Sequence, residues 1–178
     1  MRGQSWKRGL PRHANTLDDV YLVSLSRFTD DRGSLSFVEG KTHIPFTIER
    51  VFYIYDVPSG ATRAGHAHHV LEQFIVAMSG SFTVSVRTPS EARRFHLLKP
   101  FEGLYVPPMI WRDIEEFSSG SVALVLASTA YDETDYFEDY PTYVDVYTAI
   151  ASAEKTIAST QHNPEPGDGL AQRGRSNV

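Results

Sequence analysis

The stretch GATRAGHAHHVLEQFIVAMSG, residues 60–80, carries the densest chemistry of this 178-residue chain. His66 and His68 stand two positions apart, so on a strand their side chains point to the same face. If that strand lines a barrel, both imidazoles enter its interior together. The run at residues 74–78 (FIVAM) is predicted to form a further strand that stops at Ser79-Gly80.

The spacing within this stretch resembles the first motif of the cupins, G-x5-H-x-H-x3-E followed by a glycine. Gly60, His66, His68 and Glu72 occupy the matching positions, and Gly80 closes the motif after a spacer one residue longer than usual. The resemblance implies an all-β cupin domain, which is a double-stranded β-helix or jelly roll.

Short strands separated by turn residues are predicted on both sides of the histidine pair. Turn signals such as Thr29–Gly33 and Asp56–Gly60 separate apolar or alternating runs. The runs lie at residues 20–25, 34–39, 51–55, 74–78, 82–86, 94–98, 104–106 and 122–126. Strands that recur about every ten residues indicate an all-β sandwich or barrel.

Four segments follow from these patterns. Residues 1–16 are a basic arm that we expect to be flexible, and residues 17–140 form a single cupin domain. A short helix is predicted over residues 141–158, where Val144, Tyr147 and Ile150 share one face. Residues 159–178 are polar and rich in Pro and Gly, so we expect a disordered tail.

The composition excludes several classes of function. The chain has no cysteine, which excludes disulfides, thiol catalysis and thiolate metal sites. No apolar run is long enough to span a membrane, and the N-terminus lacks the apolar core of a secretory signal. We therefore expect a cytoplasmic protein. The net charge of −5 includes the basic arm, so the rest is an acidic body that binds nucleic acid poorly.

Three interpretations compete for the histidine pair. In the first, the two histidines are exposed polar groups near a turn. In the second, they bind a metal together with Glu72. In the third, they form an acid–base site without a metal. Metal cupins take a third histidine from a second motif. The corresponding stretch here, PMIWR at residues 108–112, holds Arg112 at the ligand position. A guanidinium stays protonated and cannot coordinate, so the sequence favours a site without a metal or cofactor.

A metal-free histidine pair suits an isomerase that moves a carbonyl along a carbon skeleton. Such a reaction removes an α-proton, holds an enediolate and delivers the proton to the neighbouring carbon. An imidazole, with an ordinary pKa near 6.5, can carry that proton. Arg112 and Arg63 are the candidates to meet the developing oxyanion.

Beyond the histidine pair, many short segments match one enzyme family. They are residues 32–35 (RGSL), 44–46 (IPF), 50–54 (RVFYI), 63–68 (RAGHAH), 71–73 (LEQ), 103–106 (GLYV), 108 and 111 (Pro and Trp), 113–119 (DIEEFSS), 125–128 (VLAS) and 131–136 (YDETDY). On these segments the chain resembles the sugar 3,4-ketoisomerases, the WxcM-like enzymes that act on TDP-4-keto-6-deoxy-glucose in deoxysugar biosynthesis. The resemblance covers roughly residues 17–145.

The resemblance implies a homodimer with exchanged N-terminal strands and a reaction that needs no metal. It also implies that a TDP-linked 4-keto-6-deoxy sugar becomes the 3-keto isomer. His66 would be the main base at sugar C3, and His68 would assist. The residues predicted to bind the substrate are Arg32, Tyr53, Arg63, Gln73 and Arg112.

Two positions of the predicted site vary within the family. Arg32 stands where members carry arginine or tyrosine, and Arg112 where they carry histidine or arginine. This chain pairs arginine with arginine, so the face on which C4 receives its proton is left open. Trp111 is expected to pack in the core, and the acidic residues 132–135 (DETD) are expected to form a solvated turn.

Two alternative functions stay open at this level. A 3,5-epimerase of a TDP-4-keto sugar also removes α-protons within a cupin, but such enzymes typically pair a histidine with an aspartate and use a tyrosine as acid. A cupin that binds a sugar nucleotide without turnover is the non-enzymatic alternative, because fold alone does not determine function.

Overall fold

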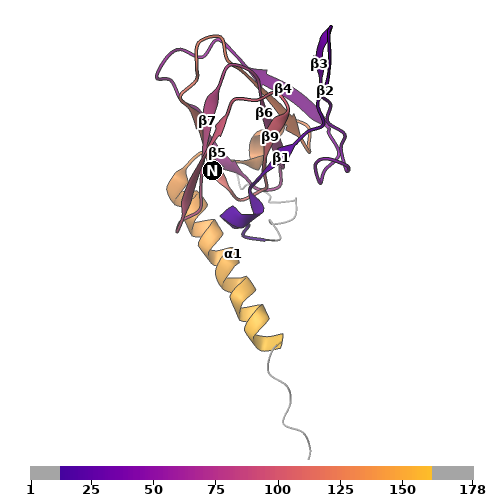
Figure 1. Cartoon of the computed structure of the whole chain (residues 1–178). Coiled ribbons are helices and arrows are strands. Elements are labelled where there is room, and N and C mark those ends of the chain that lie inside the picture. Colours follow the sequence, from indigo (N-terminus) through magenta and orange to yellow (C-terminus); the bar gives the residue numbers. More distant parts are fainter. Residues whose placement is uncertain (1–12, 162–178) are drawn as a thin grey trace, which may run out of the picture.

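A computed structural model describes residues 13–161 as a two-sheet body followed by one long helix (Figure 1). Its elements are η1 (Leu17–Asp19), β1 (Tyr21–Ser24), β2 (Phe28–Asp30), β3 (Gly33–Leu35), β4 (Arg50–Ile54), β5 (Arg63–His68), β6 (Gln73–Ser79), β7 (Phe82–Arg87), β8 (Ala92–Leu97), β9 (Glu102–Val106), β10 (Trp111–Glu115), β11 (Val122–Ala127), η2 (Glu133–Asp135), β12 (Tyr136–Phe137) and α1 (Tyr140–Gln161).

Two antiparallel five-stranded sheets form the body. The first has the strand order β1-β9-β6-β11-β4 and the second the order β12-β5-β10-β7-β8. Neighbouring strands are mostly distant in sequence, as in a jelly roll, and side chains from both sheets share one apolar core. The prediction of an all-β jelly roll is confirmed, with helix confined to short turns and to the C-terminal segment.

Strand β6 is buried on both faces, which explains its unbroken apolar run. Ile75 and Ala77 point into the core between the sheets. Phe74 belongs to a second cluster on the opposite face, where Ile44 and Phe46 from the preceding loop cover it. Because both faces are buried, the strand lacks the polar alternation of a half-exposed strand.

The histidine-bearing strand β5 lies inside the second sheet, between β12 and β10. Arg112 of β10 is the cross-strand partner of His66. On the other side, Tyr136 of β12 is the partner of His68. These pairings bring two distant parts of the chain to the histidine pair.

Helix α1 packs on the body through its first half only. Its Tyr143 is fully buried, and its hydroxyl donates to the Met109 carbonyl at 3.0 Å. The second half extends away from the sheets (Figure 1). The helix starts one residue before the predicted segment 141–158 and includes three residues of the predicted tail. Within residues 13–161, no helix is long and apolar enough to cross a membrane.

The end of the predicted arm, residues 13–16, is tied to the body. The Asn15 side chain donates to the Pro108 carbonyl at 3.0 Å, and Tyr147 donates its hydroxyl to the Asn15 carbonyl at 2.9 Å. His13 contacts Glu154 of α1 at 3.0 Å. These contacts hold residues 13–16 against Pro108 and helix α1. The predicted arm over residues 1–12 and the tail over 162–178 lie outside the described residues.

Strands β2 and β3 form a two-stranded hairpin that projects from the body (Figure 1). All six strand residues are exposed, including the large apolar side chains of Phe28 and Leu35. Arg32 lies in the turn between the two strands. The hairpin thus presents apolar surface that the other residues between 13 and 161 do not cover.

Candidate active site

A cavity of about 440 Å³ opens between the two sheets. Apolar side chains from β4, β10 and β11 form part of its wall. The polar and aromatic groups that line it include Tyr53, Arg63, His66, Gln73, Arg112 and Tyr136. The cavity therefore brings together every predicted site residue except His68, which lies behind His66, and Arg32, which lies on the projecting hairpin.

A bulge in β5 lets Arg63 and His66 line the same cavity. Side chains three residues apart on a regular strand point to opposite faces. Ala64 and Gly65 both adopt left-handed backbone conformations, with φ of 68° and 71°, and the pairing with β10 shifts register here. The extra residue reverses the alternation. A glycine at position 65 suits this conformation because it has no Cβ.

His66 and His68 are in direct ring contact, with centroids 4.8 Å apart and planes 78° from parallel. His66 borders the cavity, whereas His68 is completely buried. The ring of Tyr136 contacts both, with centroids 4.9 Å from His66 and 4.4 Å from His68. A ligand in the cavity therefore reaches His66 directly and His68 only past it.

Asp135 is buried and hydrogen-bonded to His68, which corrects the expectation of a solvated acidic turn. Its carboxylate is nearly buried and lies 3.1 Å from His68 Nδ1. It also accepts hydrogen bonds from the backbone amides of Val70 at 2.9 Å and Leu71 at 3.2 Å. Asp132, which caps η2 by accepting the Thr134 amide, orients this turn.

Neither Asp135 nor Tyr136 was singled out for a site role from the sequence. The stretch YDETDY looks like a polar surface turn, and nothing local in it indicates burial. Only the pairing of β12 with β5 carries Tyr136 and its neighbour Asp135 onto the histidine strand.

Burial keeps both imidazoles neutral. Burial is the largest cause, and together with the positive charge of Arg112 it lowers the pKa of His66 to about 3. Burial also lowers the pKa of His68 to about 4, although the hydrogen bond that His68 donates to the Asp135 carboxylate opposes this effect. Both rings therefore hold free lone pairs at neutral pH, which is the form that accepts a proton.

Arg112 is fully buried at the cavity wall and is held by the protein itself. Its Nη1 donates to the Gln73 side chain at 2.8 Å, and its Nη2 donates to the Ile110 carbonyl at 2.7 Å. Further contacts to the Pro107 and Ile110 carbonyls use the remaining Nη2 and Nε hydrogens. A guanidinium has five N–H groups. One Nη1 hydrogen is therefore left for a ligand, beside a fixed positive charge.

The other predicted binding residues lie at the mouth of the cavity or away from it. Tyr53 and Arg63 line the cavity and are exposed to solvent. The Arg32 side chain is 86% exposed and pairs with Asp30 of its own hairpin at 2.5 Å. Within one chain, Arg32 does not reach the cavity.

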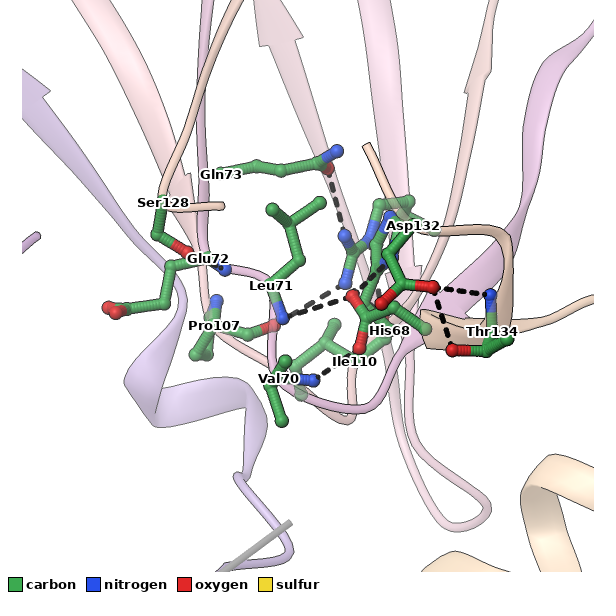
Figure 2. Close-up of polar contacts among 12 residues, drawn as sticks. His68, Val70, Leu71, Glu72, Gln73, Pro107, Ile110, Ser128, Asp132 and Thr134 are labelled. Carbon is green, nitrogen blue, oxygen red and sulfur yellow. Dashed lines mark hydrogen bonds and ion pairs between the residues drawn. The ribbon is translucent and has the colours of Figure 1, made fainter. Parts of the chain in front are cut away.

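The motif glutamate, Glu72, does not join the histidines. Its carboxylate accepts a hydrogen bond from the Tyr105 hydroxyl at 2.5 Å. Tyr105 belongs to the second apolar cluster, with Phe74 and Phe46. Figure 2 shows Glu72 directed away from His68. Over residues 13–161, no three His, Cys, Asp or Glu side chains are grouped as metal ligands. The ligands that a metal site would need, His66, His68 and Glu72, are thus not brought together.

Comparison with known proteins places this geometry in one family. The model of the FdtA family, described as WxcM-like, C-terminal, matches residues 18–148. A curated TDP-4-oxo-6-deoxy-alpha-D-glucose-3,4-oxoisomerase from Aneurinibacillus thermoaerophilus is 40% identical over 134 residues, which are 75% of this chain and 96% of that protein.

Solved structures agree in fold and, for the ketoisomerases, in sequence. A histidine-to-asparagine variant of the 3,4-ketoisomerase QdtA from Thermoanaerobacterium thermosaccharolyticum, in complex with TDP-4-keto-6-deoxyglucose, aligns with a TM-score of 0.73. It is 39% identical, and the alignment covers 75% of this chain and 97% of that one.

The 4-keto-6-deoxy sugar epimerase NovW from Streptomyces spheroides is 15% identical with a TM-score of 0.60, and the alignment covers 70% of each chain. At that identity the likeness shows the shared fold alone. The family match and the 40% identity are what decide membership. The chain belongs to the WxcM-like family of sugar 3,4-ketoisomerases.

Proposed function

We propose that this chain converts TDP-4-keto-6-deoxyglucose into the TDP-linked 3-keto isomer, with His66 as the catalytic base. The observation that carries the proposal is a neutral imidazole at a cavity wall beside a buried arginine. The curated relative is named for this interconversion, and the QdtA complex holds this substrate. A cytoplasmic location, expected from the cysteine-free sequence, belongs to the same proposal.

In the proposed reaction, His66 takes the proton from C3. The C3–H electron pair forms the C3–C4 double bond, and the negative charge moves to the oxygen on C4. The hydroxyl proton on the C3 oxygen passes to the C4 oxygen. The proton on His66 exchanges with solvent, His66 then protonates C4, and the carbonyl re-forms at C3. No atom is gained or lost, so no redox cofactor is required.

The position of Arg112 supports the proposed enediolate mechanism. An enediolate needs a positive group or a hydrogen-bond donor at its oxygen. Arg112 offers one unused N–H and a charge whose position is held by Gln73 and by backbone carbonyls. Because Arg112 is already fixed before the substrate binds, little reorganisation accompanies the charge shift.

The test is turnover of TDP-4-keto-6-deoxyglucose in D2O with chelator present, followed by proton NMR. We expect a 3-keto product with deuterium at C4. Absence of the 3-keto product, or activity that the chelator abolishes, would contradict the proposal. Binding without turnover would favour the non-catalytic alternative.

A 3,5-epimerase is the second candidate, because the His68–Asp135 pair and Tyr136 supply the residue types that such enzymes use. The same NMR experiment separates the two activities. An epimerase would introduce deuterium at C5 and keep the carbonyl at C4, whereas the proposed reaction leaves C5 protonated.

We also propose that the enzyme is a homodimer with exchanged N-terminal strands. Strand β4 is an edge of the first sheet, so its outer row of backbone groups is unpaired within the described chain. Val51 and Tyr53 on β4 are exposed, as are Phe28 and Leu35 on the hairpin. Exchange would cover this apolar surface and carry Arg32 toward the cavity of the second copy.

A further inference from the structure

The Asp135 carboxylate accepts all its side-chain hydrogen bonds from residues 68–71. Oδ1 accepts the Val70 amide at 2.9 Å, and Oδ2 accepts the Leu71 amide at 3.2 Å and faces His68 Nδ1 at 3.1 Å. This short segment links the end of β5 to the start of β6. Asp135 thus holds both the backbone beside His68 and its imidazole ring.

These contacts determine where His68 carries its proton. Backbone amides only donate, so a carboxylate that accepts two of them is bound as an acceptor. It can then accept from His68 only if the proton lies on Nδ1. The other ring nitrogen, Nε2, keeps the lone pair. This Nε2 is fully buried and has no hydrogen-bond partner among the residues that the structure describes.

The order of groups from the cavity inward is His66, His68 and Asp135. His66 lines the cavity, His68 contacts its ring at 4.8 Å, and Asp135 lies on the far side of the buried His68. The backbone of Ala64 favours the protonated form of His66, and the His66 ring borders the cavity, where it can act as the base. A proton gained there creates a positive charge next to His68.

We infer that Asp135 is a positioning residue of the proposed isomerase, which holds the His68 imidazole in the Nδ1–H tautomer and supports the charge that forms on His66. The inference rests on the proposed function. In this tautomer His68 presents no N–H on its Nε2 to oppose the new cation. The Asp135 charge favours the protonated form of both rings, whereas Arg112 disfavours it.

The main variant is Asp135→Asn, which keeps the shape of the side chain and removes its charge. The amide group can present an N–H to His68 and drive its proton to Nε2. We expect kcat to fall about 100-fold or more, since acid–base support of this kind contributes about 10²–10⁴-fold. KM should stay within about threefold, because Asp135 does not line the cavity.

The matched control is Asp132→Asn in the same turn. Asp132 caps η2 by accepting hydrogen bonds from the Thr134 amide and hydroxyl. Loosening the turn should therefore lower the unfolding temperature without a large loss of kcat. Equal losses of kcat in both variants would show that Asp135 acts only by folding the turn, and the inference would be wrong.

Nitrogen-15 NMR of histidine-labelled protein gives a readout independent of turnover. In the wild type, we expect the His68 shifts of a protonated Nδ1 and an unprotonated Nε2, and in Asp135→Asn the reverse. A wild-type His68 protonated on Nε2 overturns the inference even if the variant does not fold. Failure of the wild type to form the 3-keto product would reject the proposed function instead, and the tautomer measurement would still stand.

Discussion

Arg112 and His66 are direct partners across the β10–β5 pairing, so a fixed positive charge stands beside the proposed base. After burial, this charge is the largest cause that lowers the pKa of His66 to about 3. The arrangement keeps the base unprotonated at neutral pH and places a cation where the oxyanion is proposed to form. One residue therefore serves both the base and the intermediate.

Replacing Arg112 by Gln should separate these two effects. Loss of the cation should raise the pKa of His66, so the acid limb of the kcat/KM profile should move to higher pH, because a protonated base is inactive. Loss of oxyanion support should also lower kcat by about 10²–10³-fold. The measurement is a pH series of initial rates. Arg112→Lys, which keeps a charge, is the control, and an unmoved acid limb in Arg112→Gln would contradict the prediction.

The two histidines should differ in what their replacement does. His66→Asn should lower kcat by about 10²–10⁴-fold and abolish deuterium uptake at C3, because His66 borders the cavity. His68→Asn should slow turnover less and still permit exchange at C3. Exchange rates measured by NMR on both variants give the comparison. If exchange survives in His66→Asn and is lost in His68→Asn, the base is His68.

Stability should fall in mild acid because both rings are buried in the neutral form. Their folded-state pKa values, about 3 and about 4, lie below the ordinary value, so the unfolded chain binds more protons between about pH 4 and pH 6.5. The stabilisation is complete above pH 6.5 and is lost as the pH falls. Each histidine should contribute roughly 1 kcal/mol per pH unit in this window.

Urea unfolding at several pH values measures this loss. His68→Asn should show a shallower fall of the unfolding free energy than the wild type, whatever its stability at pH 7. His96, exposed on β8 and outside the cavity, offers a matched histidine-to-asparagine control for the loss of one imidazole. Equal slopes in wild type and His68→Asn would mean that His68 is not buried as a neutral ring.

Strand exchange predicts that two inactive variants can rescue each other. Arg32→Ala and His66→Asn damage different parts of a site that is shared between copies if Arg32 crosses to the second chain. A mixed dimer then contains one intact site. Random mixing of equal amounts should restore about one quarter of the wild-type activity, after unfolding and refolding together. No gain on mixing, or a monomer in light scattering, would contradict the exchange.

The sequence predicted the apolar strands well and the polar ones poorly. Strands β6, β7 and β11 were expected within a residue or two of their bounds, because their β-branched and aromatic runs end at clear turn residues. The run WRDIE of β10 was not expected as a strand. Its Arg112 and Ile114 point inward and Asp113 points outward. Because a charged arginine takes an inward position, the sequence does not show the alternation of apolar and polar residues that indicates a strand.

The site was predicted in part, for a related reason. The motif spacing located His66, and the family match located Arg63, Gln73 and Arg112 at one cavity. Asp135 was missed because its burial depends on a two-residue strand that pairs with β5, some seventy positions away in sequence. Arg32 lies outside the cavity of its own chain because the hairpin projects from the body. The local turn pattern does not predict this direction.

The pairing of β12 with β5 also determines when, during synthesis, the chain can complete its active site. Ribosomes release the N-terminal part first, and β5 precedes β12 by most of the length of the domain. Until residues 135–137 emerge, His68 lacks its carboxylate partner and Tyr136 does not cover the two rings. The residues of the histidine strand therefore leave the ribosome before the residues that complete its site.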